Sequence, residues 1–493
     1  MGEESRNVKF MFFDNRTYEY IRGFRRELGR AHKYEGNPVI KPELPHEFKR
    51  VHYYGTALYD EKDRKYKTWY STHYYGPALK ENDAKAYAYL VYAESEDGVA
   101  FAKPALDVVP GTNIVLDNDK KTHGPSVLID DADPDPERRF KLAMSPYTAD
   151  CRICLYASPD GIHWKPMFDE PVLDVRSDCH IGFCRHPDTG AYRLSFRTRV
   201  PDRRVWVSES EDLLHWTKPA LAVEPDQSDP CHTQMYGMQM TPYGSYTIGL
   251  LSMYDTYDYT VDPGYAKMAG TMDIQLAYSR DGFCWHRCMQ GSKLVPLGAD
   301  GQWDAKCVMP STTVICRPER MELYYSAAPI DHSGFGTIPY AELPPECIGL
   351  ATLRPDGFVL LTAGSEGGEL MTRPFAVSDG SLYLNASAAD GGFVAAEVAD
   401  LEGRVIEGFA FDDCVPFVGD GAAARIRWRG DPDPSRIERR PIRVKLRAAD
   451  AEVYSFFFPH GEDPARYWTF KEISCLDPMK YDIADDGRKR VGV

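Results

Sequence analysis

Four acidic residues stand at comparable places in the chain, each at or just before an apolar segment. They are Asp178 in SDCH, Asp229 in SDPCH, Asp304 in QWD and Glu47 in PHEFKRVH. Cleavage of a glycosidic bond needs one carboxylic acid to protonate the leaving oxygen and a second carboxylate to attack the sugar or activate water. These acids are therefore the catalytic candidates, and Asp304 is favoured because Trp303 beside it offers a stacking surface. Any one of them could instead cap a turn or pair with an arginine.

Four of the 13 histidines precede apolar segments in the same way, namely His52, His123, His180 and His232. Neutral imidazoles ligate divalent metals, and each ring also offers one donor and one acceptor to sugar hydroxyls. A core imidazole bonded to a nearby carbonyl is a third interpretation. We expect these histidines to bind substrate without a cofactor, and a divalent metal held by several of them stays open as the alternative.

Aromatic and amide side chains adjoin the same positions: Tyr54, Gln234, Tyr236 and Trp303. Sugar rings present apolar C–H faces that stack on aromatic planes, while their hydroxyls need polar partners. We therefore expect these four residues to contact substrate. Because aromatic residues make up 12% of the chain, packing between strands is the alternative interpretation for the tyrosines and the tryptophan.

A repeated pattern supplies the elements that would position these residues. A strand, an Asp turn and an apolar or aromatic residue recur as YAESEDGVAF, YASPDGIHW, VSESEDLLHW, AYSRDGFCW and ATLRPDGFVL. A strand with alternating aromatics precedes each copy, and helical periodicity is nearly absent. Five meandering sheets predict a five-bladed β-propeller over residues 1–361, because stacking blades around an axis protects sheet edges. The repeated aspartates are interpreted as turn formers, and the starts of the innermost strands would crowd one mouth of the propeller.

The pattern changes after residue 361. Strands at even spacing continue without the Asp-turn signature, which predicts a β-sandwich over residues 362–493 with a polar tail from about Gly461. The expected fold class is therefore all-β.

Charge and composition exclude several classes of partner. The 493 residues carry a formal net charge of −16, which is the wrong sign for a protein that neutralises phosphates, so neither nucleic acid nor a membrane surface is expected as a partner. The opening MGEESRNVKF has no apolar leader, and no apolar stretch approaches the roughly 18 residues of a membrane span. The 12 cysteines lack a repeated spacing and are interpreted as reduced thiols of a cytoplasmic protein. Homo-oligomerisation stays open.

Several segments carry a family likeness. FFDNR, GNPVIKP, YYGTALYDEKDRKYKTWYS, DADPDPERRFK, ASPDGIHW, SESEDLLHW, QMYGMQM and QLAYSRDG resemble uncharacterised bacterial proteins grouped with the propeller of glycoside hydrolase family 32. The resemblance implies a propeller followed by a sandwich. It does not carry over fructosidase activity, because the family's W-M-N-D-P-N-G and R-D-P motifs are missing and the one Glu-Cys pair, Glu346-Cys347, is expected in the outer half of the last blade.

The predicted function is that of a glycoside hydrolase or related glycan-processing enzyme, which cleaves a terminal sugar from a small oligosaccharide or glycoside by carboxylate acid/base chemistry. Two alternatives remain. One is a carbohydrate-binding propeller without catalysis, and the other is a metal-dependent enzyme with a multi-histidine axial site.

Overall fold

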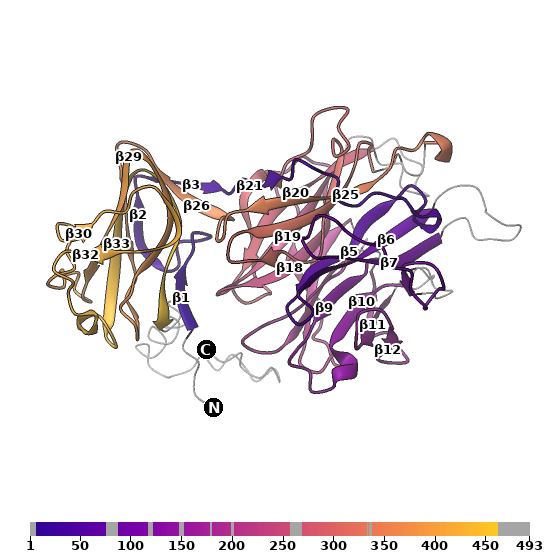
Figure 1. The fold of residues 1–493 in the computed structure, drawn as a ribbon, viewed down its shortest axis with the longest axis horizontal. Helices are drawn as coiled ribbons and strands as arrows, with labels where there is room; N and C mark the ends of the chain where they lie inside the picture. Colours follow the sequence, from indigo (N-terminus) through magenta and orange to yellow (C-terminus); the bar gives the residue numbers. More distant parts are fainter. Residues whose placement is uncertain are drawn as a thin grey trace, which may run out of the picture. The chain divides into compact units, whose positions relative to one another are not determined.

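The computed structural model describes residues 6–74, 87–116, 122–146, 152–177, 180–198, 202–256, 269–332, 334 and 338–461. The fold is all-β, as the periodicity predicts (Figure 1). It divides into two compact units, one of residues 30–353 and one formed by residues 6–29 together with 354–461. The predicted Asp178 lies outside the described residues.

The unit of residues 30–353 consists of successive antiparallel meanders. The first three are β5(Val51–Asp60), β6(Lys65–Tyr74), β7(Tyr87–Ser95) and β8(Ile114–Leu116); β9(Ser126–Ile129), β10(Phe140–Met144), β11(Arg152–Ser158) and β12(Lys165–Pro166), with β13(Leu173–Arg176) also on β11; and β14(Gly182–Arg185), β15(Tyr192–Thr198), β16(Arg204–Ser210) and β17(Ala220–Val223).

The last two meanders are joined by one parallel pairing between β20 and β22. They are β18(Thr233–Tyr243), β19(Tyr246–Thr256), β20(Gly270–Ser279) and β21(Trp285–Val295), then β22(Cys307–Pro310), β24(Met321–Ala328), β25(Cys347–Leu353) and β4(His32–Lys33), with β23(Ile315–Cys316) on β24. The last strand of the fifth meander thus comes from the start of this unit, because β4 pairs with β25.

The meanders follow one another in a closed order. The first strand β5 contacts β9, β9 contacts β14, β14 contacts β18, and β22 of the fifth meander returns to β5. Apolar clusters lie between neighbours: Trp69 and Leu90 pack with Phe140 and Leu142, for example, and Tyr70 packs in one cluster with Tyr324. The core is therefore distributed between adjacent sheets and is not collected in one layer.

The repeated Asp turns hold the meanders locally. Asp97 accepts hydrogen bonds from the backbone N–H groups of Val99 and Ala100 at 2.8 Å, and Ser95 Oγ donates to it at 2.8 Å. Corresponding bonds form at Asp160, Asp212 and Asp281. The carboxylates of these turns are occupied by backbone donors, which is the turn-forming role predicted for them.

Three of these turns also form hydrogen bonds with a neighbouring sheet. Trp69 Nε1 of the first meander donates to the carbonyl of Gly161 in the second turn at 2.6 Å, and Tyr324 of the fifth meander donates to the carbonyl of Gly98 in the first at 2.5 Å. Arg193 Nη2 of the third meander donates to the carbonyl of Asp281 in the turn of the fourth meander at 2.8 Å. A local turn signal therefore also serves long-range packing.

The second unit is built from both ends of the described chain. Its nine-stranded sheet contains β1(Arg6–Phe10), β2(Tyr18–Arg22), β3(Phe24–Leu28), β26(Val359–Ala363), β27(Gly368–Thr372), β28(Phe375–Ala376), β29(Tyr383–Ala399), β31(Asp420–Arg425) and β33(Pro441–Gly461), and a separate pair joins β30(Cys414–Val415) to β32(Arg427–Trp428).

This division differs from the boundary at residue 361 that the sequence predicts. Strand β1 pairs with β33, β2 with β27 and β3 with β26, so the first strands belong with the last ones. The physical reason is aromatic packing, since the Phe10 ring stacks on Phe456 with centroids 4.6 Å apart and meets Phe375 edge-on at 4.7 Å. In Figure 1 the indigo strands β1 and β2 accordingly lie among the orange and yellow strands of the same unit.

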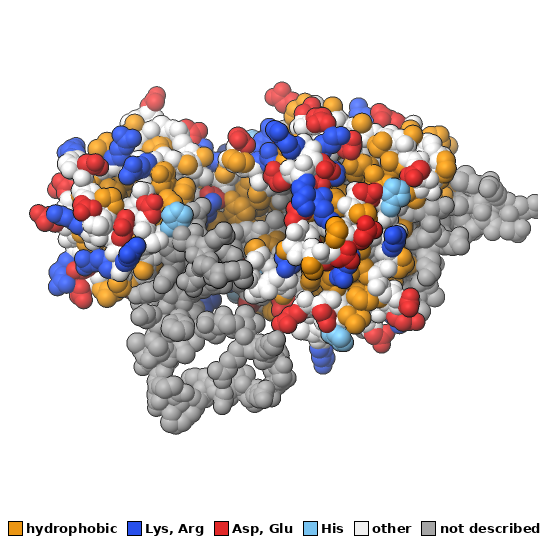
Figure 2. All heavy atoms as spheres, turned by 60° about the horizontal axis from the view of Figure 1, so that its bottom comes forward, with side chains coloured by type: hydrophobic (Ala, Val, Ile, Leu, Met, Phe, Trp, Pro, Cys, Tyr) orange, Lys and Arg blue, Asp and Glu red, His pale blue; other side chains and the backbone are white. Residues whose placement is uncertain are grey.

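Within the described residues, the four 3-10 turns are η1(Pro45–Glu47), η2(Pro136–Arg138), η3(Tyr340–Glu342) and η4(Pro434–Arg436). No helix in this part of the chain is long and apolar enough to cross a membrane. Figure 2 shows basic and acidic side chains interspersed over the face that it presents.

A buried ion pair joins the first and second meanders. The Asp60 side chain is fully buried, and both of its oxygens accept from Arg139, at 2.7 and 2.8 Å, while Lys67 Nζ donates at 2.9 Å. Burial alone would raise the pKa of Asp60, but Arg139 and Lys67 outweigh it and lower this pKa. The ionised carboxylate therefore contributes stability above about pH 4, and this contribution is lost as pH falls through the lowered folded pKa.

We expect Asp60→Asn to lower the free energy of unfolding by about 3 kcal/mol at neutral pH, because two cations lose their buried partner. Urea denaturation measures this change. The control is Asp63→Asn, since Asp63 also pairs with Lys67 but its side chain is 51% exposed, so its loss should cost less than about 1 kcal/mol. Equal effects of the two substitutions would contradict the buried role of Asp60.

Candidate functional site

Three of the four predicted histidines converge on one tyrosine. The ring of Tyr54, in β5, lies 4.6 Å from His52, 5.2 Å from His123 and 5.4 Å from His180, measured between centroids. These histidines come from the first three meanders, at or just before their first strands. All three are at least nine-tenths buried. The alignment of first strands read from the sequence thus brings these residues together.

Two further histidines belong to the same cluster and were not predicted. His73, near the end of β6, stacks on His52 with centroids 4.5 Å apart. His332, after β24, lies 5.2 Å from the ring of Tyr236. The fourth predicted histidine, His232, is half-buried just before β18, where its carbonyl accepts from Thr256 Oγ1 at 2.8 Å.

A chain of hydrogen bonds runs through the tyrosines. The hydroxyls of Tyr54 and Tyr236 lie 2.6 Å apart, and the Tyr236 hydroxyl lies 3.0 Å from Nε2 of His332. The Tyr254 hydroxyl lies 3.5 Å from Nδ1 of the same ring. The rings pack in one apolar cluster with Met272 and Cys307. Tyr54 and Tyr236 therefore share one cluster, with their hydroxyls hydrogen-bonded to one another.

Arginines border the tyrosine cluster. The guanidinium of Arg197, which is 1% exposed, lies 4.1 Å from the ring centroid of Tyr236. Arg203 lies 5.7 Å from the same centroid, and its Nη1 donates to Oε1 of Gln234 at 2.7 Å. A cation over an aromatic face is favourable, and burial strengthens the attraction. Gln234 thus holds an arginine at the edge of the cluster.

Glu346 is the carboxylate of this cluster, and it is 1% exposed. Arg50 Nε donates to its Oε2 at 2.7 Å, and His52 Nδ1 lies 3.3 Å from the same oxygen. Its backbone is fixed as well, because Glu346 N donates to the carbonyl of Lys49 and Val51 N donates to that of Glu346. The sequence suggests an outer position for Glu346-Cys347, whereas the structure places Glu346 beside the start of β5, the first strand of the first meander.

Electrostatics keep Glu346 ionised. Burial alone would raise its pKa, but Arg50 and His52 outweigh burial and lower it to about 2. Burial lowers the pKa of His52, His73 and His180, the last to about 3, so these rings are neutral at pH 7. The centre of the cluster therefore combines one fixed negative charge with neutral imidazoles.

A second carboxylate, Asp331, lies nearby. Burial, then Glu346 and Asp331, raise the pKa of the Cys307 thiol, so both acids lie within electrostatic reach of one buried sulfur atom. Oδ1 of Asp331 is buried, and no described residue forms a hydrogen bond with it. Asp331 precedes His332 directly, yet neither follows a recognisable motif, so no sequence signal distinguishes them.

Two predicted acids lie elsewhere, in pairs of their own. Lys33 Nζ lies 2.6 Å from Asp304 Oδ2, and the Tyr325 hydroxyl donates to the same oxygen at 3.4 Å, with Trp303 stacked on Tyr325 at 5.7 Å. Arg287 clamps Asp229 with two donors, at 2.5 and 2.8 Å. Trp303, Asp304 and Asp229 thus take part in contacts of the fifth and fourth meanders, and no described contact joins them to the histidine cluster.

The predicted acid Glu47 is fully buried and its oxygens have many donors. It accepts from the backbone N–H groups of Glu43 and Leu44 at 2.8 and 2.9 Å, from the Tyr70 hydroxyl at 2.7 Å and from Lys103 Nζ at 2.8 Å. A carboxylate with four donors has little capacity left for a substrate. These contacts fix the turn η1 to the first meander.

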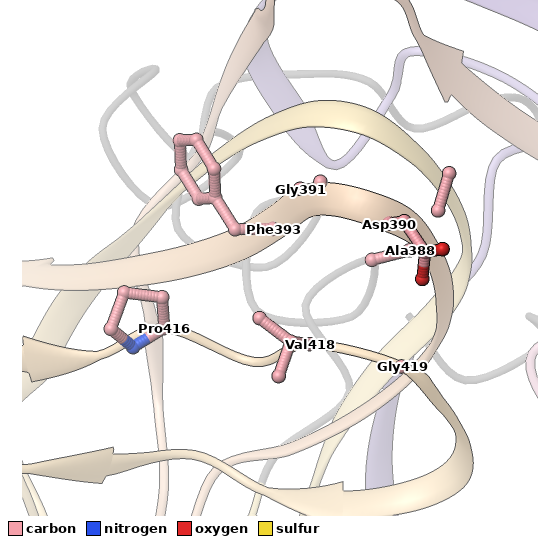
Figure 3. Close-up of a pocket in the computed structure, with 9 residues that line it drawn as sticks. Ala388, Asp390, Gly391, Phe393, Pro416, Val418 and Gly419 are labelled. Atoms are coloured by element: carbon pink, nitrogen blue, oxygen red, sulfur yellow. The ribbon is translucent and has the colours of Figure 1, made fainter.

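Two open cavities are lined by residues outside this cluster. One of about 540 Å³ is in the second unit, between β29 and the segment after β30, where Phe393, Pro416 and Val418 line it beside a single carboxylate, Asp390 (Figure 3). Another of about 460 Å³ is lined by residues 166–172 and Leu214. The second is lined by two acids that are neighbours in the chain, Asp169 and Glu170. Within the described ranges, no group of three or more His, Cys, Asp or Glu side chains is arranged to hold a metal ion.

Comparison with known proteins gives structural neighbours alone. No protein-family model matches the sequence, and no curated protein matches it significantly. A structure described under the GH130 family of mannoside phosphorylases, which contains glycoside hydrolases that target β-1,2 mannosidic linkages in Candida mannan, matches with a TM-score of 0.45 and 15% identity over 67% of this chain and 95% of that one. A glycosyl hydrolase from Bacteroides ovatus has a TM-score of 0.45 and 15% identity over 66% and 94%.

A third neighbour is the catalytic domain of a GH62 α-L-arabinofuranosidase from Coprinopsis cinerea, with a TM-score of 0.44 and 12% identity over 66% of this chain and 97% of that one. None of the three descriptions names family 32, so that resemblance stays a prediction. We therefore infer function from the side chains of the site.

We expect Arg50→Gln to lower the free energy of unfolding by about 3 kcal/mol at pH 7, because it leaves the Glu346 carboxylate buried without its cation. In the native protein the lowered pKa of Glu346 contributes stability above about pH 4 that is lost as pH falls towards 2. In the variant, burial dominates and raises this pKa, so its deficit relative to the native protein should shrink on acidification. Denaturation curves at several pH values measure this, and the double variant Arg50→Gln/Glu346→Gln should regain part of the loss. A deficit independent of pH would contradict the pairing.

Proposed function

We propose that residues 30–353 form a five-bladed β-propeller and that the other unit is a β-sandwich. Five meanders in closed order support the propeller, as does the pairing of β4 with β25, which would complete the last blade with a strand from the other end of the unit. Such closure protects the edges that separate sheets would expose. The histidine cluster would then lie at the axis, since it joins the starts of the first strands.

We propose further that the protein is a glycoside hydrolase or related glycan-processing enzyme that cleaves a terminal sugar from a small oligosaccharide or glycoside. One observation carries this proposal: an ionised buried carboxylate, Glu346, lies among neutral imidazoles, tyrosine hydroxyls and a second acid. The hydroxyls of a sugar need many donors and acceptors, its C–H faces suit aromatic rings, and its glycosidic bond needs two carboxyl groups.

The chemical roles follow from the electrostatics. A carboxylate with a pKa of about 2 holds no proton at neutral pH, so Glu346 suits the nucleophile or the base, or stabilises a developing positive charge on the sugar. Asp331, whose Oδ1 has no hydrogen-bond partner among the described residues, is the candidate for the acid that protonates the leaving oxygen. This pair takes the place of Asp304, Asp229 and Glu47 in our proposal, and Asp178 remains a candidate.

The proposal extends to the cofactor, the substrate and the location of the enzyme. The reaction would need no cofactor, its substrate would be a small carbohydrate and not nucleic acid or membrane, and the enzyme would act in the cytoplasm. The rival function is carbohydrate binding without catalysis, which the same hydroxyl-binding groups would support. A metal held by the histidines would be a third mechanism, and it predicts loss of activity in EDTA together with a stoichiometric metal in elemental analysis.

Glu346→Gln should lower kcat on a cleavable glycoside at least about 100-fold, because the amide can neither attack the sugar nor carry a negative charge. A broad panel of glycosides analysed by mass spectrometry first identifies the substrate. The matched control is Glu322→Gln, since Glu322 is also fully buried and is paired with Arg320, but at the opposite end of the same sheet. Binding without turnover across the panel would favour the rival function, and equal activity of both variants would remove Glu346 from the mechanism.

A further inference from the structure

Three nitrogen atoms at the centre of the cluster are buried, and no described residue forms a hydrogen bond with them. They are Nδ1 and Nε2 of His180 and Nε2 of His52. His180 is 0% exposed and His52 is 1% exposed. Leaving a buried polar atom unsatisfied costs free energy, so native proteins supply such atoms with a partner, from the chain, from ordered water or from a ligand.

The packing holds these rings in place without using the nitrogens. The Tyr54 ring lies 4.6 Å from His52 and 5.4 Å from His180, and His73 stacks on His52 with centroids 4.5 Å apart. Gly237 makes room for His180, because a Cβ atom at residue 237 would lie only 3.0 Å from His180 Cβ. Aromatic packing fixes the orientation of the imidazoles and leaves their polar edges for another group.

The protonation state determines which group that can be. Burial, then His52, Arg197 and His123, lower the pKa of His180 to about 3, so the ring keeps one N–H donor and one bare acceptor nitrogen across the ordinary pH range. A hydroxyl both donates and accepts, and it can serve either nitrogen. Carboxylate and phosphate oxygens accept without donating, and an ammonium group donates without accepting, so each would leave one nitrogen of His180 unsatisfied.

His52 adds a second point of contact. Its Nδ1 lies 3.2 Å from Arg50 Nη2 and 3.3 Å from Glu346 Oε2, so this edge of the ring is already engaged. Whichever tautomer it adopts, Nε2 retains one unused donor or acceptor function. A ligand hydroxyl on this nitrogen would lie across the imidazole ring from the Glu346 carboxylate, to which the proposed function assigns the chemistry.

We propose that His180 and His52 bind hydroxyl groups of an uncharged sugar ring, so that this part of the site selects neutral sugars over uronic acids, sugar phosphates and amino sugars. This inference rests on the proposed function for the sugar itself but not for the cleavage. It names the substrate class from the hydrogen-bonding capacity of two neutral rings.

The test is titration calorimetry with methyl glycosides of neutral hexoses and pentoses, each compared with its uronic acid and amino-sugar counterpart. At least one neutral glycoside should bind, and its charged counterparts should bind at least about 10-fold more weakly, which corresponds to about 1.4 kcal/mol. The affinity should be constant between about pH 5 and about pH 8, because the neutral rings do not titrate there. Tighter binding of a charged sugar, an affinity that changes through about pH 6.5, or binding of none of the neutral glycosides would overturn the proposal.

Variants of His180 separate ligand binding from a structural role. His180→Phe fills a similar volume without polar atoms, so it should weaken sugar binding at least about 10-fold while the melting temperature stays the same or rises. His180→Asn keeps one donor and one acceptor and should recover part of the affinity. An unchanged affinity in His180→Phe, or a loss that follows unfolding in both variants, would overturn the role of His180. Hydrolysis is measured separately, so a glycoside that binds by these criteria without being cleaved would reject the proposed function and leave this inference intact.

Discussion

The site depends on one interaction, the buried ion pair between Arg50 and Glu346. A carboxylate taken out of water is tolerated only where a cation and hydrogen-bond donors replace its hydration, and Arg50 at 2.7 Å and His52 at 3.3 Å supply that replacement. The pair also joins the segment before the first meander to the segment before β25 of the fifth, and the backbone pairing of Arg50 with Glu346 runs beside it. The contact that keeps Glu346 ionised therefore also joins the fifth meander to the first.

Buried charges elsewhere in the same unit are treated differently. Asp60 with Arg139 and Lys67, and Asp130 with Lys141, Arg185 and Tyr192, connect neighbouring meanders and direct nearly all of their capacity to partners within the protein. Around Tyr54 the balance is reversed, since imidazole nitrogens and an Asp331 oxygen are buried with no partner among the described residues. Buried polar atoms without a described partner occur elsewhere in the unit as well, such as Glu322 Oε2, so it is their concentration on His52 and His180 that supports the proposed ligand site.

The arrangement also bears on the competing interpretations of the histidines. Their rings face one another edge-on or stacked, at centroid distances of 4.5 to 6.1 Å, with tyrosines between them. Burial keeps them neutral, and neutral rings can bind hydroxyl groups without adding charge to a cluster that already contains Arg50, Arg197 and Glu346. The hydrogen-bonding capacity of the neutral rings therefore supports the proposal of hydroxyl recognition.

The local features of the fold could be predicted from the amino-acid sequence. Alternating strands and Asp turns depend on contacts between residues close in the chain, so the repeats and the all-β class could be read directly, and aligning the first strands was enough to bring His52, His123 and His180 together. Other features were decided only by the tertiary structure. The strands of residues 6–28 pair with strands beyond residue 354, and Glu346 reaches Arg50 across most of the chain.

The spacing of residues in the sequence does not predict such contacts, because they form only when distant segments fold against each other. For the same reason the sequence did not predict His73 or His332 as members of the cluster. The predicted acids Asp229, Asp304 and Glu47 share one local pattern, yet they form ion pairs with Arg287, Lys33 and Lys103. Local pattern places a carboxyl group on a strand. Packing between sheets then determines which cation or donor this carboxyl group contacts, and hence whether it can bind a substrate.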